Sequence, residues 1–273
     1  MRRPASRPHR ARAALTFALA LLLLALVLAA SHCDLAVSLS GLEGGCPPTR
    51  GPGQVKITSG GSPFCIDTTE VTNAQYRQFA QSGFTLSGGA IPDGCQGLTG
   101  SALSMSPASG TDDFPVVNVN WCQAYEFCAW AGKRLCGQIG GGALDSMLDT
   151  NAKQSQWLNA CSDGGRLTYP YGNTFSAMAC GGMADDTTMP AIVASQPGCV
   201  GSVGGLYDMS GNVWEWTDAC GNAPAGGTAA MAFCDAMGGA FDSMTSELEC
   251  VGERNWTRNA GAGNIGFRCC LDL

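Results

Sequence analysis

The most informative stretch of this 273-residue chain is a glycine-containing acidic turn that leads into two tryptophans, and it reads Gly205-Leu206-Tyr207-Asp208-Met209-Ser210-Gly211-Asn212-Val213-Trp214-Glu215-Trp216. Carboxylates stand near both ends of the turn, at Asp208 and Glu215. Two carboxylates brought close repel each other, so a bound cation is physically reasonable here. The alternative is a turn whose carboxylates accept hydrogen bonds from backbone N–H groups.

Four other segments accompany this stretch in a fixed order, and they are Phe64-Cys65-Ile66-Asp67 with Glu70-Val71-Thr72-Asn73-Ala74-Gln75-Tyr76, Pro115-Val116-Val117-Asn118-Val119 followed by Ala129-Trp130-Ala131-Gly132-Lys133-Arg134-Leu135, Tyr169-Pro170-Tyr171-Gly172-Asn173, and Gly266-Phe267-Arg268. Together the five segments resemble the formylglycine-generating enzyme family, also called the sulfatase-modifying factor domain. The resemblance covers about residues 55–270. It implies an irregular α+β fold, related to the C-type lectin fold, with little regular secondary structure and stabilising calcium.

Active members of this family oxidise a sulfatase cysteine to formylglycine, using molecular oxygen and copper held by two cysteines. Soft thiolates suit Cu(I), which explains the need for a cysteine pair. In those enzymes the pair follows a Gly-Gly-Ser-aromatic turn, which here reads Gly238-Gly239-Ala240-Phe241. Ser243 then stands at the first cysteine position and Leu248 at the second. A hydroxyl is a poor ligand for Cu(I) and leucine is none. The resemblance therefore predicts no catalytic residue and no copper, unless Cys250 or another cysteine substitutes.

The resemblance also implies a calcium site within residues 205–216. Carried over residue by residue, its ligands are the carboxylates of Asp208 and Glu215 and the backbone carbonyls of Gly211 and Val213. Hard oxygen ligands on a tight turn are those that calcium prefers.

Residues 1–31 are expected to be a signal peptide or an N-terminal anchor. Five arginines precede an almost unbroken apolar run from Ala13 to Ala30, followed by small residues. This is the pattern of an export signal, although about 18 apolar residues can also just span a bilayer. The protein is therefore expected outside the cytoplasm, either secreted, periplasmic or at the cell surface, with membrane contact only if the segment is not cleaved. Residues 32–54, rich in Gly and Pro, are predicted to be a linker, and residues 55–273 a single domain.

Removal of the N-terminal segment changes the charge and leaves no histidine. The segment holds five of the 15 Lys and Arg residues and none of the 22 Asp and Glu residues, so the remainder carries a net charge of −12. Such a surface repels phosphate backbones, which argues against a nucleic-acid partner. Both histidines, His9 and His32, lie in or next to the segment. The absence of histidine from the rest of the chain excludes a Ser-His-Asp triad, a Cys-His dyad and histidine-ligated zinc there.

The cysteines after Cys33 number 14, an even number that predicts seven disulfides in an oxidising compartment. The family resemblance implies two pairs, Cys128–Cys269 and Cys161–Cys250. Closure of irregular loops suggests two more, Cys220–Cys234 and Cys180–Cys199. The alternative of a thiolate metal cluster lacks any C-x-x-C motif.

Regular secondary structure is predicted to be sparse. Capping boxes begin helices at 72–81 and 121–131, and a weaker helix covers about 151–160. Short strands are expected at 55–58, 116–119, 192–194 and 265–270, with irregular loops at 174–189 and 221–237. Lys133 and Arg134 are expected to form structural ion pairs. The core is expected to hold most of the tryptophans, namely Trp121, Trp130, Trp157, Trp214 and Trp216.

These observations predict an extracytoplasmic domain of this family that is a non-catalytic binding or structural module, stabilised by disulfides and calcium. Two alternatives stay open, a formylglycine-generating oxidase dependent on copper and oxygen, and a calcium-dependent lectin-like binder. The expected partner is a protein or glycan ligand that the sequence does not identify.

Overall fold

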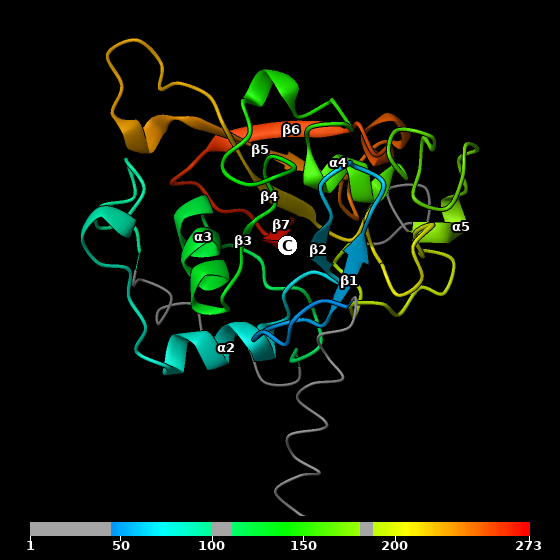
Figure 1. Ribbon diagram of the computed structural model, residues 1–273, viewed down its shortest axis with the longest axis horizontal. Coiled ribbons are helices and arrows are strands. Elements are labelled where there is room, and N and C mark those ends of the chain that lie inside the picture. Colours follow the sequence, from blue (N-terminus) through cyan, green and yellow to red (C-terminus); the bar gives the residue numbers. More distant parts are fainter. Residues whose placement is uncertain (1–44, 100–110, 181–187) are drawn as a thin grey trace, which may run out of the picture. The chain divides into compact units, whose positions relative to one another are not determined.

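The computed structural model of the chain describes residues 45–99, 111–180 and 188–273 (Figure 1). Residues 48–273 form one compact unit. The predicted signal segment and most of the predicted linker lie outside the described residues. Residues 48–54, which the sequence assigned to the linker, belong to the compact unit: Arg50 N–H donates to the carbonyl of Ala131 at 3.3 Å, and Lys133 Nζ donates to that of Pro52 at 2.9 Å. Within the described ranges, no helix is long and apolar enough to cross a membrane.

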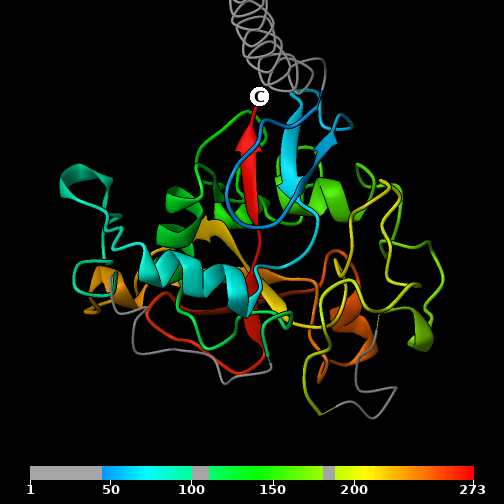
Figure 2. The same ribbon diagram turned by 90° about the horizontal axis from the view of Figure 1, so that it is seen from below.

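Two four-stranded sheets organise the compact unit. The first has the order β1-β2-β8-β3 and is antiparallel, with β1 (Gln54–Ile57), β2 (Phe64–Asp67), β8 (Cys269–Asp272) and β3 (Arg134–Leu135). Figure 2 shows β1 and β2 in blue beside β8 in red. The second has the order β6-β5-β4-β7, with β6 (Glu253–Thr257), β5 (Phe233–Met237), β4 (Trp214–Cys220) and β7 (Ile265–Phe267).

A single residue, Arg268, separates the two sheets along the chain. Strand β7 pairs in parallel with β4 in one sheet and ends at Phe267, whereas β8 begins at Cys269 in the other. The predicted strand at 265–270 is therefore two strands. The backbone step between the sheets places the Arg268 side chain in the interior, where it is 0% exposed.

The two helices predicted from capping boxes are present. Helix α2 (Asn73–Gln81) begins at the Thr72–Gln75 capping box, and α3 (Trp121–Trp130) begins at the Asn120–Gln123 box. Each reciprocal box satisfies N–H groups that have no partner within the helix. The other helices are shorter: α4 (Gln156–Cys161) starts later than predicted because Ser155 caps it, and α5 (Ala177–Cys180) has one turn. The remaining helical segments are the 3-10 turns η1 (Gly88–Ala90), η3 (Ser146–Leu148), η5 (Ala229–Met231) and η6 (Thr245–Leu248).

Two of the predicted strands are wrong. Residues 116–119 form no strand and residues 193–194 form a turn; Asn118 and Ala194 adopt left-handed φ values of 60° and 55°, which a regular strand does not contain. The opposite error occurs at 221–237, which was predicted to be irregular and contains β5. The low content of regular structure agrees with the irregular, disulfide-rich α+β fold that was expected.

The core consists of two main apolar clusters. The larger packs α2 and α3 against the second sheet, with the Tyr76 and Phe127 rings stacked at 5.9 Å. The second lies around β2 and α4 and includes Trp157. All five tryptophans that were predicted to be in the core are buried, with at most 8% of each exposed.

Candidate functional site

The turn at residues 205–216 is held between the two sheets. Tyr207 N–H donates to the carbonyl of Thr68 at 2.8 Å, and Gly211 N–H donates to that of Gly238 at 2.9 Å. Asp208 and Asn212 both have φ values of 56°, a left-handed conformation that Asp and Asn tolerate better than most residues. The turn then runs directly into β4.

Glu215, on β4, forms a buried two-pronged ion pair with Arg268. The guanidinium Nε and Nη2 atoms donate to Oε2 and Oε1 of Glu215, each at 2.6 Å, and Trp157 Nε1 donates to Oε2 at 2.7 Å. Arg268 also donates to the carbonyls of Asp67 at 3.0 Å and Tyr207 at 2.9 Å. Arg268 therefore ties β4, β2 and the acidic turn together.

The signature pair Lys133-Arg134 forms structural ion pairs, as predicted. Lys133 Nζ lies 2.5 Å from Oδ1 of Asp67, with both side chains fully buried. Burial raises the pKa of Asp67 to about 6, although Lys133 acts in the opposite direction. Arg134 holds Asp272 through Nε and Nη2, both at 2.8 Å.

Glu70 is a buried carboxyl beside this network that sequence reasoning did not single out. Its Oε1 accepts from Asn212 Nδ2 at 2.8 Å, whereas its Oε2 is buried without a hydrogen-bond partner. Burial, followed by the charges of Asp208 and Glu215, raises the pKa of Glu70 well above its usual range. Burial likewise raises the pKa of Asp208 to about 6. With three carboxylates and one guanidinium, the network carries excess negative charge unless a proton or a cation compensates it.

The predicted calcium ligands can be tested against this arrangement. The charge excess and the unpartnered Glu70 Oε2 fit a bound cation. Asp208 Oδ2 accepts one hydrogen bond, from Ala194 N–H at 2.5 Å, and carboxylates can accept several. Glu215 differs from the prediction, because Arg268 and Trp157 occupy both its oxygens. No group of three or more His, Cys, Asp or Glu side chains in the described ranges is arranged to hold a metal. Asp208 and Glu70 are the carboxylates of this network that Arg268 and Trp157 do not occupy.

The two residues at the expected copper positions are part of the packed interior. Ser243 is 2% exposed, and its Oγ accepts from Ala240 N–H at 3.0 Å, closing the Gly-Gly-Ala-Phe turn. Leu248 is also 2% exposed, and its carbonyl accepts from Ser210 Oγ at 2.6 Å. Cys250, the candidate substitute, is bonded to Cys161.

All 14 described cysteines are disulfide-bonded. The four pairs expected from the sequence are present, namely Cys128–Cys269, Cys161–Cys250, Cys220–Cys234 and Cys180–Cys199. Two further pairs are Cys95–Cys122 and Cys136–Cys270, and Cys46 and Cys65 are bonded as well. The described part of the domain therefore offers no thiolate to a metal.

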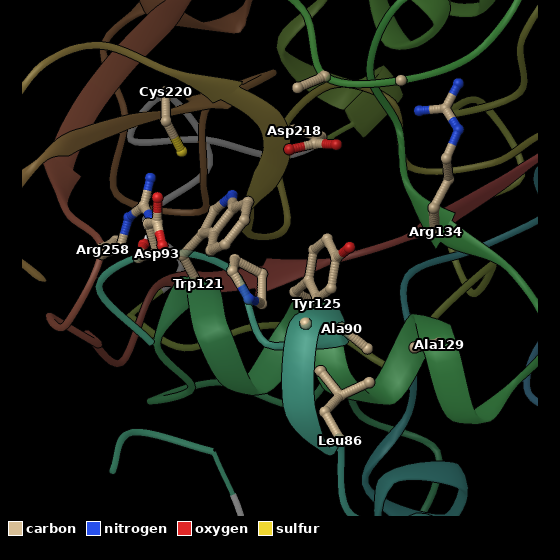
Figure 3. A pocket seen from close by; sticks show the side chains of 14 residues that line it. Leu86, Ala90, Asp93, Trp121, Tyr125, Ala129, Arg134, Asp218, Cys220 and Arg258 are labelled. Atoms are coloured by element: carbon tan, nitrogen blue, oxygen red, sulfur yellow. Dashed lines mark hydrogen bonds between the residues drawn. The ribbon is translucent and has the colours of Figure 1, made fainter. Parts of the chain in front are cut away.

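A cavity of about 620 Å³ lies beside α3, and Arg134 and Cys220 are among the residues that line it (Figure 3). The labelled residues that point toward it include Trp121, Tyr125, Asp218 and Arg258, which come from α3, the end of β4 and the segment after β6. Sequence reasoning placed Trp121 in the core and missed the cavity. Its members lie up to 172 residues apart along the chain, from Leu86 to Arg258, so no local pattern could have revealed it.

Comparison with known proteins agrees with this architecture. The model of the "Sulfatase-modifying factor enzyme 1-like domain" matches residues 49–273. A hercynine oxygenase of Mycolicibacterium thermoresistibile is 28% identical over 178 residues, which cover 56% of this chain and 35% of that protein. The inactive C-alpha-formylglycine-generating enzyme 2 of Bos taurus is 28% identical over 178 residues, covering 60% and 53%. The chain thus spans about a third to a half of the length of these curated relatives.

A solved structure, that of CarF, shares the fold with a TM-score of 0.52 at 22% identity, over 77% of this chain and 87% of that one. The family match extends over almost the whole compact unit. The chain therefore belongs to the family of sulfatase-modifying factor enzyme 1-like domains.

Proposed function

We propose that this domain is a non-catalytic, extracytoplasmic binding or structural module of the family. The observation that carries the proposal is the pair of substitutions at the copper positions, Ser243 and Leu248, both buried and both engaged in the packing of their turn. Rearranging Ser243 to hold a metal would break the contact of its Oγ with Ala240 N–H, and Leu248 has no ligand atom in its side chain. Because Cys250 is held in a disulfide, it does not replace the missing ligands.

Oxidised cysteines support the proposed location. Disulfides form and persist in secreted, periplasmic and cell-surface proteins and are rare in the cytosol. The 14 bonded cysteines hold together long loops that regular structure does not fix. A protein or glycan is the proposed class of partner, and the acidic charge of the domain disfavours nucleic acid.

The domain, mixed with copper, oxygen and a Cys-x-Pro-x-Arg peptide, is expected to leave the peptide mass unchanged. The native domain, residues 45–273, is expected to contain no free thiol, because every cysteine of this range is in a disulfide. Mass spectrometry and a thiol reagent measure both quantities, with an active formylglycine-generating enzyme as the positive control. Conversion of the peptide cysteine to formylglycine would disprove the non-catalytic proposal.

We also propose that calcium binds at the acidic turn, through the carboxylate of Asp208 and the carbonyls of Gly211 and Val213, with Glu70 as an additional carboxylate. The support is the excess negative charge around Arg268 and the unpartnered Glu70 Oε2. Glu215 contributes by orienting Arg268, which in turn holds the Tyr207 carbonyl beside Asp208. The ion would act as a structural staple.

Removal of calcium with EGTA at pH 7.5 is expected to lower the melting temperature by about 5–10 °C, if the ion was present at about 100 times its Kd. Asp208→Asn is expected to lose most of this response, whereas Asp112→Asn, on the exposed Arg77–Asp112 pair, should keep it. Differential scanning fluorimetry measures the shift. Equal melting temperatures with EGTA and with calcium would overturn the calcium proposal.

A further inference from the structure

The cavity beside α3 contains a buried carboxylate whose oxygens accept no hydrogen bond from the described residues. Asp218 is 9% exposed and lies at the end of β4, where its backbone is fixed by bonds to Cys136 and Leu144. Figure 3 shows its carboxylate at the edge of the cavity, opposite Tyr125. Because no described donor occupies its oxygens, the Asp218 carboxylate can accept hydrogen bonds from a donor that enters the cavity.

The two arginines of the cavity are engaged elsewhere. Arg134 donates to Asp272 and to the carbonyls of Leu135 and Gln138. Arg258 donates to the Asp93 carbonyl, and its guanidinium carbon lies 4.8 Å from the Trp121 ring centroid. Its Nε is buried and so inaccessible to a ligand. Both arginines act on Asp218 at a distance, without a hydrogen bond.

The cavity also has an aromatic wall. The Trp121 and Tyr125 rings stack with centroids 5.2 Å apart, and Arg258 lies on the other side of Trp121 in Figure 3. Burial, followed by the Asp218 charge, raises the pKa of the Tyr125 phenol, which is therefore protonated at neutral pH. Leu86, Ala90 and Ala129 complete an apolar side.

Two disulfides fix the walls of the cavity in place. Cys95–Cys122 joins the rim loop, just after Asp93, to the first turn of α3, and Cys220–Cys234 holds the end of β4, two residues beyond Asp218. A site that is rigid before binding loses less entropy when a ligand enters. The volume of about 620 Å³ is within the usual range for small-molecule pockets.

We propose that this cavity binds a small organic amine, with the protonated nitrogen on the Asp218 carboxylate and an apolar or aromatic body against Tyr125 and the Leu86–Ala90 side. An ammonium forms a charge-assisted hydrogen bond with a carboxylate, which is about twice as strong as a neutral one. The net charge of −12 beyond residue 33 attracts cations toward the domain, whereas the cavity lining itself balances Asp93 and Asp218 against Arg134 and Arg258. A sugar hydroxyl could also donate to the Asp218 carboxylate, but it brings no positive charge to pair with it. The inference gives the proposed binding module a class of ligand and in that respect rests on the proposed function.

The test is isothermal titration of the domain with phenethylamine, with phenylacetate and methyl α-glucoside as anionic and neutral comparators. Phenethylamine is expected to bind saturably, and Asp218→Asn to weaken it on the order of tenfold or more. Asp112→Asn, an exposed carboxylate outside the cavity, is the matched control and should leave the affinity unchanged. Because burial raises the pKa of Asp218 to about 6, wild-type affinity should fall as the pH drops below 6, when this carboxylate becomes neutral.

Absence of saturable amine binding, equal affinity of the Asp218→Asn and wild-type domains, or tighter binding of the glucoside would overturn the proposal. The melting temperature of Asp218→Asn checks that the variant is folded. The result is independent of the formylglycine assay. If the domain binds no amine and leaves the peptide cysteine unmodified, only the amine-site proposal fails. If it binds the amine but forms formylglycine, only the non-catalytic proposal fails.

Discussion

Arg268→Met is expected to destabilise the domain by about 3–5 kcal/mol, because it leaves the buried Glu215 carboxylate without its countercharge. The substitution keeps an apolar side chain of similar length while removing both 2.6 Å contacts to Glu215. It also takes the donors away from the Asp67 and Tyr207 carbonyls. Urea unfolding measures the loss, since urea does not screen charge. At an ordinary stability of 5–15 kcal/mol, such a loss approaches global unfolding.

A second substitution distinguishes charge from packing. Glu215→Gln retains an acceptor for Trp157 Nε1 and removes the unpaired charge, so the Arg268→Met/Glu215→Gln double variant should recover much of the stability lost in Arg268→Met. Arg77→Ala serves as control. Its ion pair with Asp112 is exposed, and such pairs contribute about 0–1 kcal/mol. An Arg268→Met variant within 1 kcal/mol of the wild type would contradict the assigned role of this ion pair.

Local chemistry made part of this fold predictable. The capping boxes at Thr72 and Asn120 specify helix starts through residues only three positions apart, and the structure has both. The family resemblance predicted the pairs Cys128–Cys269 and Cys161–Cys250, and closure of irregular loops suggested Cys180–Cys199 and Cys220–Cys234. Strands were harder, because β5 is fixed by pairing with β4 and β6 rather than by a local signal, and a single left-handed residue can interrupt an extended run.

The site was less predictable, because the availability of a side chain depends on its neighbours in space. Glu215 has the chemistry of a calcium ligand, but Arg268, 53 residues later, takes its oxygens. The Gly266-Phe267-Arg268 segment was visible in the sequence. An arginine in a motif between apolar residues was the signal that a carboxylate partner could exist. Asp218 carried no such signal. Its lack of a hydrogen-bond donor depends on Arg134 being bonded to Asp272 and on Arg258 being placed over the Trp121 ring.

Simultaneous removal of the Cys128–Cys269 and Cys136–Cys270 disulfides, by alanine at all four positions, is expected to cost about 7–8 kcal/mol and to leave the domain largely unfolded. The bonds close loops of 141 and 134 residues that nearly coincide, since their ends lie eight residues apart on one side and one on the other. Chain entropy gives about 5 kcal/mol for the first long loop that is closed.

Once one of these bonds is in place, the other closes a ring of only about ten residues, worth about 2.5 kcal/mol. Each single removal should therefore cost about 2.5 kcal/mol, and the double removal should exceed the sum of the two by about 2.5 kcal/mol. The control pair is Cys180–Cys199 with Cys220–Cys234, whose loops of 19 and 14 residues do not overlap, so their costs should add. Guanidinium unfolding of the six variants measures both cycles. Additive losses for the first pair would show that the two bonds constrain the unfolded chain independently, despite their almost identical loops.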